Sequence, residues 1–478
     1  MQYTKEIISE HLYLIDKSIN MKYITNKSLI EWFQPFIDTI TDEFQVPYLL
    51  NTSERFRASP LSSTIIGLNS ANLLPDNALD IMYKNLIFLK DNNISSDQST
   101  KETRKASEDK EGWSLGEGVS VWSTSLAIIA LLSNEKKDPN ITYAYKNSVI
   151  WLANQRSSGY AYQNHTNCDK NSIMTAHASY ALSLSLKNKQ IFKFNRNEEQ
   201  TIINAITDSF TYLKQNIIKK KYWVFNNKPN SYATIWSLIS IKEMISCEQI
   251  QTETIETIET FYKDVYDKCV NYVLASMPRE IKCWDSEQIV KEAGAKYAKQ
   301  KNYHSFSPTL ILQLMDLGVS AYHPKIINQI CWLIDNEGKW KIREYDKDNM
   351  CTFTYAMVLS AIVKWVNAVG KENARELINN RTSRTRKLTT LFFGYPYMKS
   401  RPQVMLYKNK MISYIILLLI ISLLCILRGY IINLFKWILN LVLTNGDTIL
   451  INVISSGVYY FLGLLLTVMV SYFLRRGK

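Results

Sequence analysis

Residues 111–132 read EGWSLGEGVSVWSTSLAIIALL, a turn with glycine and tryptophan followed by an apolar run. The same construction returns along the chain, with a polar residue three or four positions before a threonine that opens an apolar run. Its copies end at Thr64, Thr124, Thr175, Thr234, Thr309 and Thr352. Subtraction puts successive threonines 60, 51, 59, 75 and 43 positions apart, the size of a helical-hairpin repeat. The sequence therefore predicts repeated pairs of helices.

The residue types within each copy indicate how the pairs are arranged. Serine or asparagine before the threonine accepts hydrogen bonds from the free N–H groups at a helix N-terminus. The run after the threonine, such as LAIIALL at 126–132, is apolar nearly all round, and such a helix is surrounded by protein. Amphipathic runs such as 199–215 precede the turns. Because one hairpin cannot bury its own apolar face, we expect the hairpins to stack in an inner and an outer layer.

Two runs carry a resemblance to a known family. WLANQRSSG at 151–159 and WLIDNEGKW at 332–340 resemble the aromatic-Leu…Gln-x-x-x-Gly-x-Trp repeat of squalene and terpenoid cyclases. With WSTSLAIIAL at 122–131, the chain resembles the superfamily of terpenoid cyclases, protein prenyltransferase β-subunits and complement-like thioester domains. The resemblance implies an all-α fold, a single (α/α)6 toroid of about six helical hairpins. Ala161 stands where the first run should end in tryptophan, and Asn336 with Glu337 replaces the glutamine of the second.

Length, cysteines and charge define the class of protein and its domains. The chain has 478 residues. Its N-terminus has acidic residues and no apolar core, so we do not expect it to be a secretory signal. The seven scattered cysteines are expected to be thiols in a reducing compartment. Of the net charge of +13, residues 381–410 carry eight positive charges and no negative one, and residues 411–478 carry a net +4. Residues 1–380, the predicted toroid domain, are left with +1, which argues against a nucleic-acid partner.

The C-terminal part contains two long apolar runs. Residues 412–427 have no charged side chain and continue after Arg428 and Gly429 into a further apolar run, and residues 448–474 have no charged side chain. Each region can supply the roughly 20 residues of a bilayer-spanning helix. Basic residues flank both outer ends, so the positive-inside rule puts both ends in the cytoplasm. We expect a two-span transmembrane hairpin over 411–478, as in a bacterial inner membrane. A third span at 430–444 is the alternative. The basic linker 381–410 either binds anionic lipid or only sets topology.

Asp346 and Asp348 are the candidate catalytic residues. They follow Trp340 much as the DxDD acid motif follows a tryptophan turn in class II terpenoid cyclases. The resemblance implies that Asp348 donates a proton with Asp346 as its partner, which requires a carboxyl group kept protonated by desolvation or by the second carboxylate. However, DKDNMCT at 346–352 matches DKNSIMT at 169–175 position by position. The aspartates can therefore belong to the general turn-and-cap pattern.

No residue pattern predicts a metal or a cofactor. A prenyltransferase holds zinc with an Asp-x-Cys pair and a distant histidine, and no Asp-x-Cys occurs here. The nearest groups are CWD at 283–285 with His304, and the set His165, Cys168, Asp169 and His177. Neither has the spacing of a recognised zinc site. The thioester signature, phosphate loops, nucleophile elbows and HExxH helices are also absent from the sequence.

Trp122, His177, Trp236 and Tyr355 are the candidate ligand-binding residues, since all four fall on predicted inner helices. They line a pocket for an isoprenoid chain or a cation, or they are ordinary core. Our leading hypothesis is a membrane-anchored cytoplasmic module that binds or senses a lipid-like molecule, a peptide or a protein. One alternative is an isoprenoid-processing enzyme with Asp348 as the acid. The other is a membrane effector restrained by the toroid.

Overall fold

The computed structural model divides into two compact units, Met1–Thr390 and Leu391–Lys478. It describes residues 2–40, 46, 58–91, 111–113, 119–133, 145–156, 161–163, 170–225, 227–279, 281–282, 284, 286–291, 297–302, 306–337, 340, 351–379, 433 and 436. The predicted linker 381–410 and the predicted hairpin 411–478 therefore lie outside the described residues, apart from Asn433 and Lys436.

The described chain is mostly helical, which confirms the all-α class. Buried helices alternate with more exposed ones along the first unit. The buried helices are α4 (Ala58–Ser70), α6 (Val121–Leu132), α9 (Ser172–Lys187), α12 (Ser231–Ile245), α14 (Phe306–Asp316) and α16 (Thr352–Val369). The helices that precede them are α3 (Leu29–Thr39), α5 (Asp76–Asp91), α8 (Lys146–Asn154), α11 (Arg196–Gln215), α13 (Thr252–Ser276) and α15 (Pro324–Asp335). The shorter or terminal helices are α1 (Gln2–Ile19), α2 (Met21–Thr25), α10 (Lys189–Phe192) and α17 (Lys371–Asn379).

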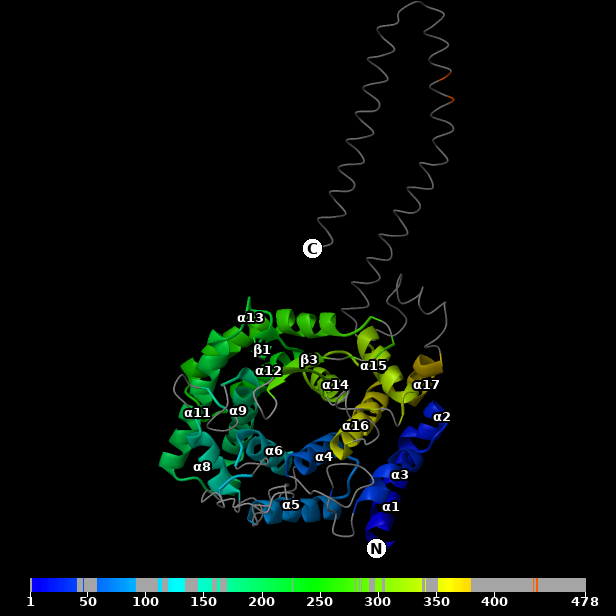
Figure 1. Ribbon diagram of the computed structural model, residues 1–478, viewed down its shortest axis with the longest axis horizontal. Coiled ribbons are helices and arrows are strands. Elements are labelled where there is room, and N and C mark those ends of the chain that lie inside the picture. Colours follow the sequence, from blue (N-terminus) through cyan, green and yellow to red (C-terminus); the bar gives the residue numbers. More distant parts are fainter. Residues whose placement is uncertain are drawn as a thin grey trace, which may run out of the picture. The chain divides into compact units, whose positions relative to one another are not determined.

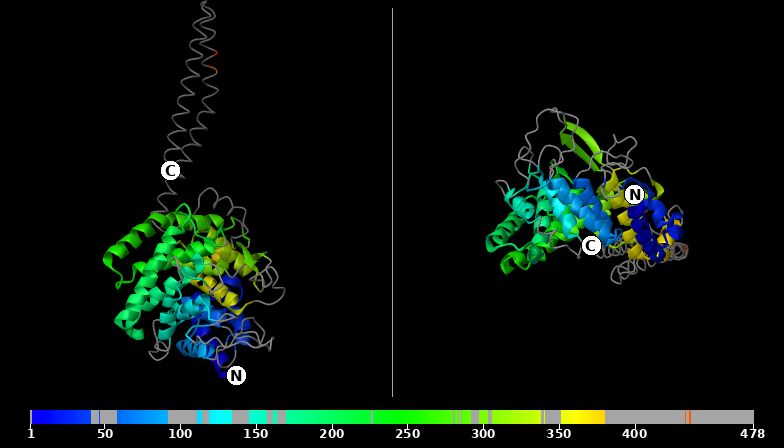
Figure 2. Two further views of the ribbon diagram at one scale, coloured as in Figure 1. Left: turned by 60° about the vertical axis from the view of Figure 1, so that its left-hand side comes forward. Right: turned by 90° about the horizontal axis from the view of Figure 1, so that it is seen from below.

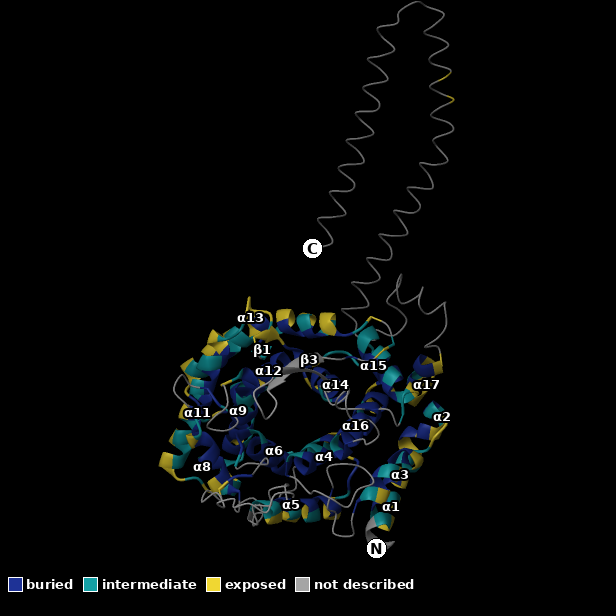
Figure 3. Ribbon diagram, viewed as in Figure 1, coloured by how far each residue is buried: buried dark blue, intermediate teal, exposed yellow. Residues whose placement is uncertain are grey.

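The buried helices contact one another in a closed cycle (Figure 1). Helix α4 packs against α6, α6 against α9, α9 against α12, α12 against α14, α14 against α16, and α16 against α4 again. Helices α5, α8, α11, α13 and α15 pack outside this cycle, and their exposed residues face away from it (Figure 3). The two layers expected from the repeat are therefore present in the first unit.

A turn amide and a buried threonine hydroxyl form the recurring contact between the turn and the inner helix. The threonine Oγ1 accepts from the backbone N–H of an aromatic residue that precedes the helix. These bonds are Trp113 to Thr124 at 3.0 Å, Tyr162 to Thr175 at 3.1 Å and Trp223 to Thr234 at 3.1 Å. In these three copies the threonine is the fourth residue of its helix. The turn aromatic residue of the copy that ends at Thr175 is thus Tyr162, one position beyond Ala161.

The residue before each of these helices forms two further hydrogen bonds between the turn and the helix. Ser120, Asn171 and Asn230 each accept, through their side chains, from the N–H group three positions later, as predicted for N-caps. Their own backbone N–H groups donate to the carbonyl of the same turn aromatic residue, at 2.9, 3.2 and 3.0 Å. The turn residue is therefore held through both its backbone groups, which fixes where the inner helix begins.

Glycine and tryptophan occur in the turn for different structural reasons. A Cβ atom on Gly112 would lie 2.6 Å from Thr124 Oγ1 and 2.4 Å from Val119, so no larger residue fits. The indole N–H of the turn tryptophan donates to a carbonyl near the end of the preceding outer helix. Trp113 donates to Leu86 at 2.8 Å, and Trp223 donates to Leu213 at 2.8 Å. The tryptophan thus ties an outer helix to the turn and satisfies a carbonyl.

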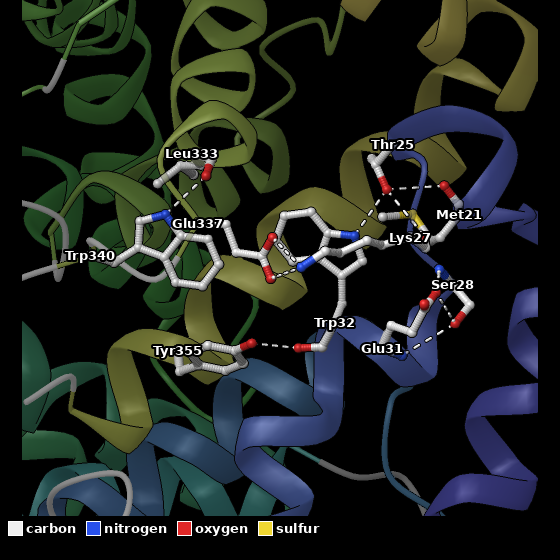
Figure 4. Close-up of polar contacts among 10 residues, drawn as sticks. All are labelled: Met21, Thr25, Lys27, Ser28, Glu31, Trp32, Leu333, Glu337, Trp340 and Tyr355. Carbon is white, nitrogen blue, oxygen red and sulfur yellow. Dashed lines mark hydrogen bonds and ion pairs between the residues drawn. The ribbon is translucent and has the colours of Figure 1, made fainter.

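The N-terminal helices meet the last hairpin at a seam formed by two stacked indoles (Figure 4). The rings of Trp32 on α3 and Trp340 lie 6.0 Å apart and nearly parallel. The Tyr355 hydroxyl on α16 donates to the Trp32 carbonyl, and Lys27 pairs with Glu337 at 2.9 Å. Segments more than 300 residues apart in sequence are therefore joined at this point.

Two antiparallel hairpins are additions to the predicted all-helical chain. Strand β1 (Val224–Phe225) pairs with β2 (Lys228–Pro229), and β3 (Ser286–Lys291) pairs with β4 (Tyr297–Asn302). The second hairpin stands clear of the helices in Figure 2 and lies within the widest threonine spacing, the 75 positions from Thr234 to Thr309. The sequence predicts no strand over 286–302, because these residues have neither strict alternation nor a strong turn signal.

Among the described helices, α16 is the one long and apolar enough to cross a membrane. However, 78% of its apolar window is buried within the protein, and it packs against α4, α14 and α15. These contacts identify α16 as a core helix of the first unit. The predicted spans after residue 411 are not among the residues searched.

Replacing Thr234 by Val tests the turn-to-helix contact. Valine keeps the shape but leaves the buried Trp223 N–H without its acceptor, which costs about 1–3 kcal/mol. We expect a lower midpoint in urea unfolding of the full chain followed by tryptophan fluorescence. Thr201→Val is the matched control, because the Thr201 hydroxyl bonds only within the exposed face of α11, and it should change stability by less than about 0.5 kcal/mol. Equal effects of the two substitutions would contradict the assignment.

Candidate functional site

Three of the predicted ligand-binding residues come together where α6, α9 and α12 meet. Trp122 is the second residue of α6, and His177 and Trp236 are the sixth residues of α9 and α12. The His177 ring centroid lies 4.5 Å from that of Trp122 and 3.8 Å from that of Trp236. Because all three belong to the first two turns of their helices, the N-terminal ends of these helices lie side by side.

Tyr232 and Tyr180 complete the group. The Tyr232 ring lies 5.8 Å from His177 and 6.1 Å from Trp236, and Tyr180 meets Trp236 edge-on at 5.7 Å. Neither tyrosine is among the binding residues predicted from the sequence. Tyr232 stands one helical turn before Trp236, and this four-residue spacing could have indicated a shared face. We call these five residues the aromatic cluster.

Hydrogen bonds determine the tautomer of His177. The Ile173 carbonyl can only accept, so His177 Nδ1, at 2.8 Å, carries the proton. Nε2 is then an acceptor, and the Tyr232 hydroxyl donates to it at 3.3 Å. Burial lowers the pKa of His177 to about 3, with the Ile173 hydrogen bond acting in the opposite direction. The imidazole is therefore neutral at physiological pH.

Most of the cluster is shielded from solvent, but two of its residues are partly exposed. His177 is fully buried, Tyr232 is 7% exposed and Trp236 is 6% exposed, whereas Trp122 and Tyr180 are only partly buried. Burial raises the pKa of both tyrosine hydroxyls. Among the described residues, Trp236 Nε1 has no acceptor in hydrogen-bond geometry, although its indole lies near the Tyr232 hydroxyl. The cluster thus combines aromatic faces, a neutral imidazole and an indole N–H beside a tyrosine hydroxyl.

Tyr355 lies apart from the cluster. It is 1% exposed, its ring contacts Trp340 at 5.1 Å, and its hydroxyl donates to the Trp32 carbonyl at the seam. The prediction placed it with the other aromatic residues because it too falls on an inner helix. Its place on α16 instead directs it to the contact with α3, so it serves as core at the seam.

The candidate acids Asp346 and Asp348 lie outside the described residues, and their role stays a prediction. The nearby helix start does bear on the capping alternative. Cys351 is the N-cap residue of α16, and Thr352 is its first residue, whereas Thr175 is the fourth residue of α9. Cys351 makes no side-chain cap hydrogen bond, so α16 begins differently from α9, whose N-cap Asn171 accepts from the Met174 N–H.

Most of the candidate metal-ligating residues also lie in parts of the chain that the structure does not describe. His165, Cys168, Asp169, Cys283, Asp285 and His304 lie outside the described residues. Within the described part of the chain, no three His, Cys, Asp or Glu side chains gather closely enough to hold a metal ion. His177 is surrounded by aromatic rings and uses both ring nitrogens in hydrogen bonds to protein groups.

Beyond the cluster, a polar cleft of about 510 Å³ lies on the outer layer, between one face of α11 and the start of α13. Its walls include Arg156, Asn204, Gln249 and Thr254, and Arg156 is ion-paired with Asp208. No member of the aromatic cluster lines this cleft.

No protein-family model matches the chain, and no curated protein sequence matches it. Among solved structures it is similar to the type II terpene cyclase MstE from Scytonema, in complex with geranylgeranyl dihydroxybenzoate. The identity is 9%, the match covers 75% of this chain and 99% of that one, and the TM-score is 0.27. Similarity at this level transfers neither activity nor substrate to this chain.

The buried neutral His177 predicts a pH dependence of stability. Its folded pKa lies below the unfolded value of about 6.5, so the unfolded chain binds more protons and stability falls as pH drops from 6.5 toward 3. His177→Gln should flatten the dependence of the unfolding free energy on pH in this window by up to about 1.4 kcal/mol per unit. Urea titrations at pH 4.5 to 7.5 measure it, and parallel curves for variant and wild type would contradict a neutral His177.

Proposed function

We propose that this protein is a membrane-tethered α/α toroid that binds an apolar, isoprenoid-like molecule at the aromatic cluster. The observation that carries the proposal is the meeting of Trp122, His177, Tyr232 and Trp236 at the N-terminal ends of three inner helices. The closed cycle of inner helices supports the toroid. The charge-free runs at 412–427 and 448–474 support the tether.

The chemistry of the cluster favours an apolar ligand with a small polar group. Indole and phenol rings offer large faces for an alkene chain, and the imidazole carries no charge that would have to be desolvated. The partly exposed Trp122 is where a ligand can meet the cluster. The Trp236 Nε1–H provides a donor for a hydroxyl or carbonyl oxygen on such a ligand.

A lipid-like ligand is consistent with the proposed location. A toroid tethered by residues 411–478 at the cytoplasmic face of a membrane would draw its ligand from the bilayer, where isoprenoid chains are concentrated. In this view the toroid is a binding or sensing module, and the two-span hairpin holds it at the source of its ligand.

Catalysis is the competing function. It is supported by the sequence order of Trp340, Asp346 and Asp348, which resembles that of the class II cyclase acid motif. If Asp348 is an acid of the class II cyclase type, incubation with an isoprenoid epoxide should give a cyclised product that Asp348→Asn abolishes. Retained ligand binding without any product from wild type or variant supports the binding module.

Trp122→Ala tests the binding site. Removing an aromatic ring at the centre of a binding site commonly costs 2 kcal/mol or more, so we expect at least about 30-fold weaker binding of a farnesyl or geranylgeranyl alcohol. Tryptophan-fluorescence quenching of the full chain in detergent measures it. Phe88→Ala removes an exposed aromatic ring on α5 and should leave affinity unchanged. Affinity unaffected by Trp122→Ala would remove the cluster as the ligand site.

A further inference from the structure

The segment that joins α11 to α12 presents an unusually basic tight turn. Residues 216–230 contain Lys219, Lys220, Lys221 and Lys228 and no acidic residue. The Lys221 N–H donates to the Ile218 carbonyl at 3.0 Å, and the Ile218 N–H donates to the Tyr222 carbonyl at 2.9 Å. These bonds close a turn with Lys219 and Lys220 at its tip.

The backbone of this tip is poorly suited to lysine. Lys219 and Lys220 both have φ of 53°, in the left-handed region. A turn with positive φ at both central residues is formed best by Asn-Gly, because a Cβ atom is disfavoured there. Strained backbone that persists on a protein surface indicates that the side chains themselves serve a purpose.

The lysine side chains have little structural use within the protein. All three are exposed, and Lys220 pairs with Asp264 on α13 at 2.7 Å while remaining 62% exposed. Lys219 and Lys221 form no ion pair with any residue that the structure describes. Ile218, beside them, is 39% exposed, one of few large apolar side chains in the described surface that are this open. The tip therefore combines unpaired positive charge with one exposed apolar side chain.

We propose that this turn, residues 218–221, is a docking point for an anionic lipid surface. Each lysine near such a surface increases the affinity of the protein for it by about fivefold at low salt. An exposed isoleucine beside them can enter the interface between headgroups and acyl chains. A turn of two exposed residues can contact a planar lipid surface. A protein partner that recognises positive charge would be expected to contact a wider basic patch. The attraction is screened by salt.

The test compares hydrogen exchange in the full chain with two kinds of preformed vesicle. The chain is diluted from detergent into vesicles of phosphatidylcholine alone or with 30% phosphatidylglycerol, and exchange is measured across 216–223 by mass spectrometry. We expect exchange to slow at least about fivefold in the anionic vesicles, and this protection to fade in 0.5 M salt. Equal exchange in the two vesicle types overturns the proposal.

A double variant separates the charge from the turn. Lys219→Asn with Lys220→Gly places the preferred residues at the tip, so the fold should be at least as stable as wild type while the lipid-dependent protection disappears. Lys193→Asn is the matched control, because Lys193 is exposed and also has positive φ, at the end of α10. Protection that survives in the double variant overturns the proposal. So does protection by polyglutamate in the absence of lipid, which would indicate an acidic protein partner instead.

Discussion

A single kind of hydrogen bond, from a turn amide to a buried threonine hydroxyl, fixes where α6, α9 and α12 begin, and the aromatic cluster depends on these three helix starts. In two copies the hydroxyl also donates to the cap carbonyl, at 3.0 Å for Thr175 and 2.7 Å for Thr234. Threonine suits this place because its hydroxyl both accepts and donates while its methyl group packs in an apolar layer. Since the same contact recurs in α6, α9 and α12, these three inner helices begin at the same point relative to their turns.

This shared register gives the two ends of the inner helices different chemistry. At the N-terminal ends of α6, α9 and α12, aromatic side chains and a neutral histidine meet. Toward the C-terminal ends, ion pairs join neighbouring helices, with Lys187 to Glu243 and Lys364 to Asp316, both at 2.6 Å. Partly exposed pairs of this kind contribute about 0–1 kcal/mol each, so they orient neighbours more than they stabilise the fold. The apolar end is the one suited to hold a lipid-like molecule.

The features that repeat along the chain could be predicted from the sequence. The features that depend on contacts between residues far apart in the chain could not. The caps at Ser120, Asn171 and Asn230 followed from residue type and position alone, and so did the burial of the helices that they begin. The partner of Tyr355 could not be deduced, since Trp32 lies 323 positions away and nothing local indicates that α3 meets α16. The β3–β4 hairpin was missed because cross-strand hydrogen bonding, rather than a strong local pattern, forms it.

Whether the aromatic cluster holds an apolar molecule is the central question for this protein. The most direct measurement is organic extraction of the full chain, purified in mild detergent, followed by mass spectrometry of whatever copurifies with it. The account predicts an isoprenoid-like lipid in near-stoichiometric amount, enriched over bulk membrane lipid and depleted when Trp122 is replaced by Ala. Extracts of wild type and variant that contain the same bulk phospholipids and nothing enriched would contradict it.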